Sequence, residues 1–298
     1  MINFRGKYRP LSANRRVIID LMHEARSVPS IPVVREMDLG DLVEIRRASS
    51  QKISWFVLFI KAFSIVAHEH PILRSSLIRW PWMRLYEHPY SVCSIAIERD
   101  HGGESCLFFA HFRGPEFQSL QQMQASLEHY KGDRVESIAY FRRILQIGRL
   151  PLVLRRLLWT LSLNFSGMKR AKRMGTFGIT SYGSLGAESL HPISPLAFTL
   201  NFGPISKENC VAVKVIYDHR IIDGSVVARR LADIEKVLKG PIRDELLGNE
   251  TNQPLFELPE TKPGSASKLK VIRHHLREKL FRRNKRKMAE VLQSSDHS

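Results

Sequence analysis

The stretch from Ile53 to Ala67 is apolar apart from Ser54, Lys61 and Ser64, and it restricts the fold more than any other feature. A helix that is apolar all round has to be covered all round, by a protein core or by lipid. The run is shorter than the roughly 20 residues that a transmembrane helix needs. We therefore predict a buried helix over residues 53–69, with the rest of a globular domain packed around it.

A second apolar stretch, from Leu150 to Phe165, is interrupted by Arg155 and Arg156. Charged side chains are costly in the bilayer interior, so we predict a buried helix here as well, and no transmembrane segment. The opening residues 1–16 lack the apolar centre that marks a secretory signal. These features indicate a cytoplasmic protein, with peripheral contact to a membrane surface as the alternative.

The cysteine pattern agrees with a reducing compartment. The chain has three cysteines, Cys93, Cys106 and Cys210, and none belongs to a C-x-x-C pair. Three scattered thiols form no disulfide framework and give no support to a metal or redox centre. We expect no metal and no covalently bound cofactor.

Positive charge is concentrated near the C-terminus. The formal net charge is +17, and residues 268–287 hold ten Lys/Arg and one Glu, which is +9 of that total. We divide the chain into a folded domain (1–245), a Pro/Gly-rich linker (246–267) and a basic amphipathic tail (268–298). A basic amphipathic helix suits an anionic membrane surface. The lack of interleaved aromatic residues gives no support to nucleic-acid binding, and a solvated charged tail is the alternative.

Hydrophobic periodicity predicts a mixed α/β domain. A hairpin is expected where residues 91–99 and 104–112 flank the sequence DHGG. Four further strands are expected at 31–39, 175–183, 196–205 and 210–219, and helices at 15–26, 118–130 and 137–172, the last broken at Pro151. A helix with one apolar stripe follows the last strand and is expected to end at Gly240 and Pro241.

The sequence DHRIIDG (218–224) joins the last strand to this helix and carries the first candidate site residues. By the period of two, His219 continues the apolar face of the strand, so a neutral imidazole there is a credible general base. A hydrogen-bonded core histidine is the alternative. Asp223 is either a helix cap or a support for the histidine. Asp218 and Arg220, on the opposite face, are expected to form an ion pair.

Several segments together resemble one family, the catalytic domain of the dihydrolipoamide acyltransferases of 2-oxoacid dehydrogenase complexes. Besides DHRIIDG, these are LSANRRVIIDLMHEARSVP, ISWFVLFIKAFSIVAHEHPILR and GTFGITSYGSLG, in the family's order and within residues 10–240. The resemblance implies a chloramphenicol acetyltransferase-like fold, a two-layer α/β sandwich in which a mixed sheet has helices packed on one face. It also implies a homotrimer whose active sites form between neighbouring subunits.

The resemblance assigns roles to individual positions. His219 matches the base that takes a proton from a thiol. Thr180 matches the hydroxyl, usually a Ser in the family, that donates a hydrogen bond to the thioester oxygen; an ordinary strand threonine is the alternative. Asp223 matches a residue that braces the loop, and Arg15 is our candidate for the arginine that supports it.

The chain also departs from the family pattern. We expect a stand-alone form without a lipoyl domain, so that any lipoyl group acts in trans. Ser181 replaces the Asn that follows the catalytic hydroxyl in the family, and residues 137–172 differ from the corresponding segment. These differences leave the acyl group, the acceptor and membership of a dehydrogenase complex open.

The leading hypothesis is therefore an acyltransferase. It moves an acyl group between a thioester donor, acyl-CoA or acyl-lipoyl, and a thiol or other acceptor, with coenzyme A or a lipoyl group in trans as substrate. The expected partners are an acyl-CoA or a lipoylated protein. The alternative is a non-catalytic acyltransferase-like binding or assembly protein, held at an anionic membrane surface by residues 268–287.

Overall fold

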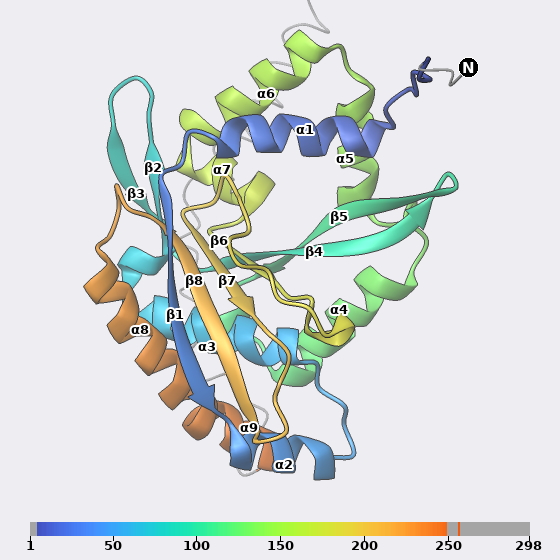
Figure 1. The fold of residues 1–298 in the computed structure, drawn as a ribbon. Helices are drawn as coiled ribbons and strands as arrows, with labels where there is room; N and C mark the ends of the chain where they lie inside the picture. The colour runs from blue at the N-terminus through green and yellow to red at the C-terminus, as the bar shows by residue number, and fades with distance from the viewer. Residues whose placement is uncertain (1–4, 249–255, 257–298) are drawn as a thin grey trace, which may run out of the picture. The chain divides into compact units, whose positions relative to one another are not determined.

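The computed structural model describes residues 5–248 and 256, which form a mixed α/β body (Figure 1). The helices predicted from the sequence correspond to α1 (Ala13–Ala25), α3 (Trp55–Glu69), α4 (Leu120–Gly132), α5 (Ala139–Arg149), α6 (Leu152–Asn164), α7 (Gly167–Met174) and α8 (Gly224–Val237). The predicted strands correspond to β1 (Ser30–Asp38), β4 (Val92–His101), β5 (Glu104–Arg113), β6 (Phe177–Thr180), β7 (Phe198–Phe202) and β8 (Cys210–Asp218). The α/β class expected from the sequence is confirmed.

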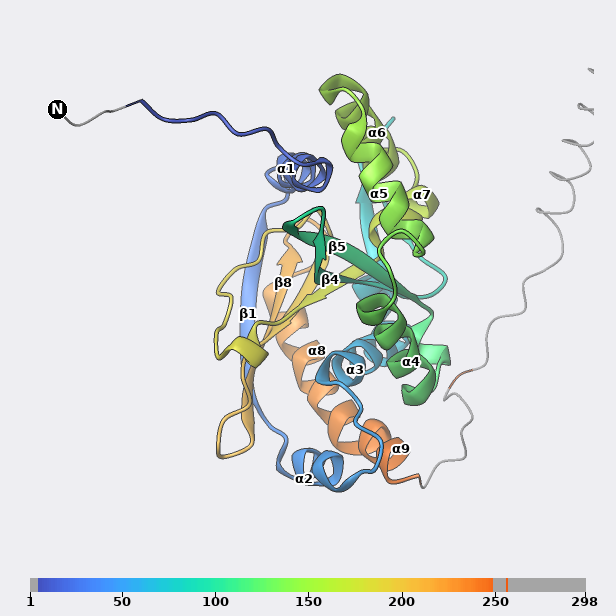
Figure 2. The ribbon, with the colours of Figure 1, turned by 90° about the vertical axis from the view of Figure 1, so that its right-hand side faces the viewer.

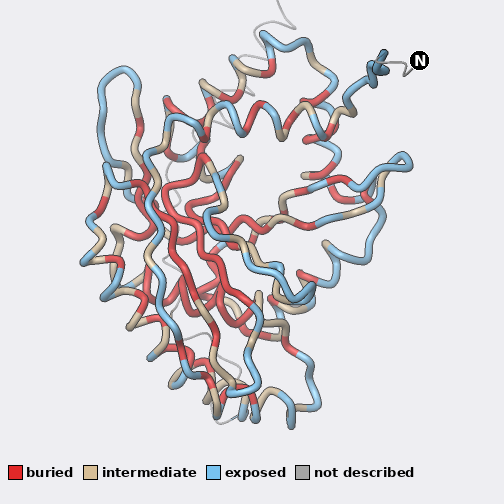
Figure 3. Tube along the Cα trace, viewed as in Figure 1, coloured by how far each residue is buried: buried red, intermediate tan, exposed pale blue. Residues whose placement is uncertain are grey.

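Six strands form one mixed sheet in the order β1-β8-β7-β6-β4-β5. The pairs β4–β6 and β6–β7 are parallel, and the remaining three pairs are antiparallel. The predicted hairpin is β4–β5, with Val92 opposite Arg113 at its base. Buried residues concentrate in the central strands of this sheet (Figure 3).

One face of the sheet is covered by α3, α4 and α8. Every residue of α3 from Val57 to Ala67 is buried, as the apolar run predicted. Two rings of the helix stack on sheet residues, Phe59 on Phe202 and Phe63 on Phe177. The one buried cation of the run, Lys61, forms an ion pair with Glu245, so that its charge is compensated inside the core.

A second helical group, made of α1, α5, α6 and α7, encloses a separate hydrophobic cluster. α1 lies along the outer strand β5, where the Asn14 amide donates to the carbonyl of Leu107 at 2.8 Å and accepts its N–H at 3.1 Å. This pairing covers polar backbone groups of an edge strand that are otherwise unpaired. The cluster consists of Val17, Leu21, Ile144, Ile147, Trp159, Leu163, Met174 and Leu196.

The prediction of a fully buried helix at Leu150–Phe165 is wrong. α6 buries only one side, on which Arg155, Trp159 and Leu163 face the cluster. Its other side is exposed although it is apolar, with Val153 75% exposed. Apolar residues lie on both sides of α6, so their spacing gives no clear signal to say which side is covered. None of the described helices is long and apolar enough to cross a membrane.

Three further elements were not predicted. They are α2 (Gly40–Ala48), the small hairpin of β2 (Ser75–Ile78) and β3 (Arg84–Glu87), and α9 (Arg243–Leu247). α8 ends at Val237, and the chain passes Pro241 in a wide π turn before α9, so Gly240 and Pro241 do not stop the helical path as predicted. The predicted linker (246–267) and tail (268–298) lie outside the described residues, apart from 246–248 and 256.

Candidate active site

His219 follows directly after the last residue of β8. Its backbone N–H donates to the carbonyl of Pro29 at 3.2 Å, which ties the loop to the chain just before β1. Its side chain is 44% exposed, and the ring of Tyr217 lies 5.7 Å away, centroid to centroid. The imidazole is therefore held by a rigid strand end and remains open to a ligand, so it is not the core histidine that was the alternative.

Asp223 lies beside this histidine. Its Oδ1 is 3.7 Å from the Nδ1 of His219, and its side chain is 79% exposed. Asp223 occupies the N-cap position of α8, but its side chain makes no capping hydrogen bond. The carboxylate thus faces the imidazole rather than the helix, at a distance that allows electrostatic attraction but is too long for a hydrogen bond.

Asp218 and Arg220 form the ion pair expected from the sequence. Arg220 Nε and a terminal nitrogen donate to the two carboxylate oxygens of Asp218 at 2.8 and 2.7 Å, and the Arg220 N–H adds a bond at 3.1 Å. The carboxylate is buried, and such a bidentate pair fixes both side chains in one geometry. The ion pair therefore holds the turn that carries His219 in a fixed position, from the opposite face of the strand.

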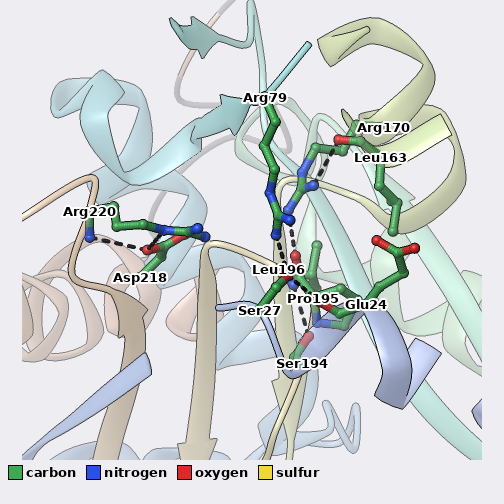
Figure 4. A network of polar contacts seen from close by, with 10 residues as sticks. All are labelled: Glu24, Ser27, Arg79, Leu163, Arg170, Ser194, Pro195, Leu196, Asp218 and Arg220. Atoms are coloured by element: carbon green, nitrogen blue, oxygen red, sulfur yellow. Dashed lines mark hydrogen bonds and ion pairs between the residues drawn. The ribbon is translucent and has the colours of Figure 1, made fainter. Parts of the chain in front are cut away.

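Behind this pair lies a polar cluster that sequence reasoning missed (Figure 4). Arg170 of α7 is buried and donates to the carbonyls of Leu163, at 3.0 Å, and Pro195. Burial, with a smaller effect of the nearby cations of Arg79 and Arg220, lowers the pKa of Arg170 to about 10, although Asp218 and Glu24 act in the opposite direction. The cluster joins α1, the β2–β3 hairpin and α7 to the His219 turn.

Thr180 is the last residue of β6, on the sheet face opposite α3. Its carbonyl accepts a hydrogen bond from the side-chain amide of Asn201 at 3.1 Å. Within the part of the chain that the structure describes, the Thr180 hydroxyl has no hydrogen-bond partner, and the side chain is half-buried at the rim of a cavity. The hydroxyl is therefore available to a ligand.

This cavity has a volume of roughly 160 Å³, far above the roughly 10–15 Å³ that one water needs. It lies between α1, the sheet and the loop of residues 192–196, and its wall is mainly apolar. Five hydroxyl side chains line the cavity, those of Ser94, Thr180, Tyr182, Ser194 and Thr199. Apolar groups come from Ile18, Leu21, Met22, Ala96, Leu107, Phe109, Met174, Ile179, Pro192, Ile193, Pro195 and Leu196.

Ser181, which stands where the family has Asn, shapes the loop after Thr180. Its hydroxyl donates to the carbonyl of Phe202 at 2.7 Å and accepts the N–H of Gly183 at 3.1 Å. A serine that bonds a backbone group two residues ahead stabilises a tight turn. Ser181 thus directs the chain away from β6 and leaves the cavity rim to Thr180.

The structure does not bring His219 and Thr180 together within one subunit. Thr180 pairs with Asn201 of β7, and Asn201 in turn faces Lys214 of β8. Lys214 is at the level of Thr180 and lies five residues before His219. At about 3.3 Å per strand residue, the two side chains are separated by roughly 16 Å along the sheet.

Arg15 does not pair with Asp223 within one subunit. It lies in the first turn of α1, where its N–H donates to the side chain of Ser12, and it is close enough to Cys106 to act on that thiol electrostatically. The opposite end of α1 is the one that leads toward β1 and the His219 turn. At 1.5 Å rise per residue, Arg15 is roughly 15 Å from that end.

The three cysteines take no part in this site. Cys93 and Cys106 are buried and Cys210 is half-buried, all as free thiols. Burial raises the pKa of Cys93 well above its usual value, so it is a poor nucleophile. Among the described residues, no group of three or more His, Cys, Asp or Glu side chains is arranged to hold a metal ion.

Comparison with solved structures shows the class of fold, which is chloramphenicol acetyltransferase-like. A probable dihydrolipoamide acetyltransferase from Listeria monocytogenes is 21% identical over 78% of this chain and 94% of its own, with a TM-score of 0.56. The dihydrolipoamide acetyltransferase of Azotobacter vinelandii is 19% identical over 81% and 94%, with a TM-score of 0.57. A truncated catalytic core of the 2-oxoacid dehydrogenase multienzyme complex from Thermoplasma acidophilum is 21% identical over 79% and 99%, with a TM-score of 0.58.

A family model matches the N-terminal part of the chain. Residues 5–130 match the model for the 2-oxoacid dehydrogenases acyltransferase (catalytic domain). The resemblance inferred from the sequence is thereby confirmed for residues 5–130, and the likeness of fold extends over 78–79% of the chain. No curated protein matches the chain.

Proposed function

We propose that this protein is an acyltransferase that moves an acyl group from a thioester, acyl-CoA or acyl-lipoyl, to a thiol or another acceptor. The observation that carries the proposal is the free hydroxyl of Thr180 at the rim of an apolar cavity. An apolar space beside a hydrogen-bond donor suits an acyl chain whose carbonyl stops at the rim. The family match supports the thioester as the source of the acyl group.

The chemistry needs a base and an oxyanion donor. A thiol with a pKa of about 8.5 is mostly protonated at neutral pH. His219 Nε2 takes this proton as the sulfur attacks the thioester carbonyl, and the protonated imidazole is stabilised by the carboxylate of Asp223. The carbonyl oxygen gains negative charge and accepts a hydrogen bond from the Thr180 hydroxyl. Collapse of the tetrahedral intermediate expels the donor thiolate, which recovers the proton from His219.

Such a site requires two subunits. His219 and Thr180 of one chain are separated by roughly 16 Å along the sheet, too far to act on the same carbonyl. We infer that His219 of one subunit meets Thr180 of a neighbour in a homotrimer. A ring with threefold symmetry then forms an identical site at every contact between subunits.

The test is acyl transfer by the purified full chain. Acyl-CoAs from acetyl to palmitoyl are offered with and without free dihydrolipoamide, and free CoA and acyl-dihydrolipoamide are separated by chromatography. We expect turnover that depends on His219 and Thr180, with a preference for chains that fit the cavity. His23→Ala serves as the matched control because His23 is an exposed histidine of α1 that lines neither the cavity nor the loop.

The non-catalytic alternative predicts a different outcome. In that case no acyl-CoA is turned over at a rate above that of the His219→Ala protein, with or without dihydrolipoamide. Binding of an acyl-CoA without turnover, measured by calorimetry, would leave a binding protein with an acyltransferase fold as the better account.

A further inference from the structure

An exposed apolar surface lies at the end of the body that carries α6 (Figure 1, Figure 2). We call it the apolar cap. It combines the outer side of α6, the chain that follows α6 and the tip of the β2–β3 hairpin. Its members, all at least two-fifths exposed, are Trp80, Trp82, Met83, Leu85, Leu152, Val153, Leu154, Leu157, Leu161, Phe165 and Met168.

The two parts of the apolar cap are joined. The ring of Trp80 stacks on that of Phe165, with centroids 6.2 Å apart and planes inclined by 9°. The N–H groups of Arg79 and Trp80 both donate to the carbonyl of Asn164, at 3.1 and 3.0 Å. The hairpin tip is therefore fixed to the end of α6, and the cap is a preformed surface.

The cap lies in a part of the chain without acidic residues. Residues 137–187 contain nine Lys/Arg and no Asp or Glu, and residues 70–86 contain three Arg and no Asp or Glu. Three of these arginines, Arg74, Arg155 and Arg170, are buried and bonded inside the body. Exposed cations such as Arg149, Lys169 and Lys172 remain around the apolar residues.

We propose that the apolar cap binds the surface of an anionic lipid bilayer. Exposed leucines and a valine on one side of a helix enter the boundary between headgroups and acyl chains. Tryptophan has an apolar ring and a polar N–H and is enriched at this depth, which suits Trp80 and Trp82. The surrounding Lys and Arg side chains meet anionic headgroups, which attract them.

A second copy of the chain is a poorer occupant. In an interface with twofold symmetry the same patch meets itself, so the cations around one cap face the cations around the other. In the threefold ring proposed above, the contact between subunits joins His219 of one to Thr180 of the next, and the cap contains neither residue. No acidic residue within 137–187 or 70–86 is present to compensate them. An anionic bilayer surface buries the apolar residues and also pairs with the cations. A second cap buries the apolar residues but leaves the cations unpaired.

The experiment uses the tryptophans of the full chain as reporters. The chain has four, of which Trp80 and Trp82 belong to the cap, Trp159 is buried and Trp55 packs beside Arg46 in the core region. No tryptophan lies in residues 268–298, so that segment cannot give the signal. We expect brominated phosphatidylcholine in vesicles with phosphatidylglycerol to quench the fluorescence. Vesicles of phosphatidylcholine alone are expected to give little quenching.

Two variants separate the cap from the rest of the chain. Leu157→Gln/Leu161→Gln is expected to weaken co-sedimentation with the anionic vesicles on the order of tenfold, because two half-exposed leucines lose their transfer into lipid. Val34→Gln, at an equally exposed valine on β1, is expected to bind like the unmodified protein. Trp80→Phe/Trp82→Phe is expected to keep binding and lose most of the quenching.

Two outcomes overturn the proposal. One is vesicle binding that shows no quenching and is the same in the Leu157→Gln/Leu161→Gln protein, which assigns the binding to another part of the chain. The other is no binding to any vesicle, together with a smaller oligomer in sedimentation for that variant. The cap is then a contact between subunits.

Discussion

Asp20 of α1 and Arg155 of α6 form a buried ion pair, with Arg155 Nε 2.7 Å from Asp20 Oδ2 and a terminal nitrogen 3.4 Å from Oδ1. The side chains are 0% and 7% exposed. Arg155 also donates to the carbonyl of Leu150 at 2.9 Å. The pair decides which side of α6 faces inward, and so which side forms the apolar cap.

Asp20→Ala is expected to lower the free energy of unfolding by about 3–5 kcal/mol, because it leaves the guanidinium of Arg155 buried without a counter-charge. Chemical denaturation at neutral pH measures the loss. Asp41→Ala, at an exposed carboxylate in the first turn of α2, is the control and is expected to change stability little. If the Asp20→Ala and Asp41→Ala proteins are equally stable, Arg155 has another partner and the ion pair is not what orients α6.

Substitutions at the candidate site should separate chemistry from stability. His219→Ala is expected to slow acyl transfer by ~10²–10⁴, and Thr180→Ala by roughly 10²–10³, whereas Thr180→Ser keeps the donor and most of the rate. Asp223→Asn is expected to lower the rate with little change in unfolding free energy, because the side chain is 79% exposed. Rates from the chromatographic assay and melting temperatures from the same samples provide the check. A folded His219→Ala protein with nearly full activity would remove the basis of the mechanism.

Mixing two inactive proteins should restore activity. His219→Ala and Thr180→Ala chains, denatured together and refolded in equal amounts, form mixed oligomers. A contact between subunits is intact when its histidine comes from the Thr180→Ala chain and its threonine from the His219→Ala chain. Random assembly makes about a quarter of the sites intact. A mixture that stays as inactive as its components, while sedimenting as the oligomer, means that the site is not shared between subunits.

Stability should depend on pH through Glu116. This residue is fully buried; its Oε1 accepts the N–H of Ser91 at 2.8 Å, and its other oxygen has no partner among the described residues. Burial raises the pKa of Glu116 from 4.5 to about 7. Below pH 4.5 the carboxyl is protonated in both states, and as the pH rises to about 7 only the unfolded state releases its proton. The free energy of unfolding therefore falls by roughly 3 kcal/mol as the pH rises from 4.5 to about 7.

Glu116→Gln is expected to remove this loss. Denaturation midpoints at pH 5 and pH 8 are compared between the variant and the unmodified protein, because other buried groups titrate as well; burial lowers the pKa of His88 to about 4, for example. The difference between the two proteins isolates Glu116. Parallel curves for the two proteins would show that the carboxyl is ionised in the fold.

Much of the fold could be predicted from local sequence. The run from Val57 to Ala67 is apolar on every side and too short to span a bilayer, which leaves a protein core as its place. The alternation along β8 likewise placed His219 at a strand end, and Asp218 with Arg220 on the other side. Periods of two and of 3.6 residues are enough for such predictions because they depend on neighbours in the chain.

What the sequence did not predict depends on contacts between distant segments. The buried side of α6 carries Arg155, Ser162 and Asn164, whereas its exposed side is mostly apolar. The pairing of Arg155 with Asp20 of α1 helps to fix which side is covered. Arg170 is buried because two carbonyls, of Leu163 and Pro195, receive its donors. Arg15 had the right residue type for a partner of Asp223, but it lies near the wrong end of its helix.

The pairing of β1 with β8 has a consequence for biosynthesis. Ser30 of β1 pairs with Asp218 of β8, so nearly the whole body must be translated before β1 is paired. Pairing between such distant segments is slow because the loop that it closes is long. Until then the nascent chain presents unpaired strand edges, which are open to association with other chains. The growing chain on the ribosome is therefore the stage most exposed to aggregation, and we expect the sheet to close only after β8 has been made.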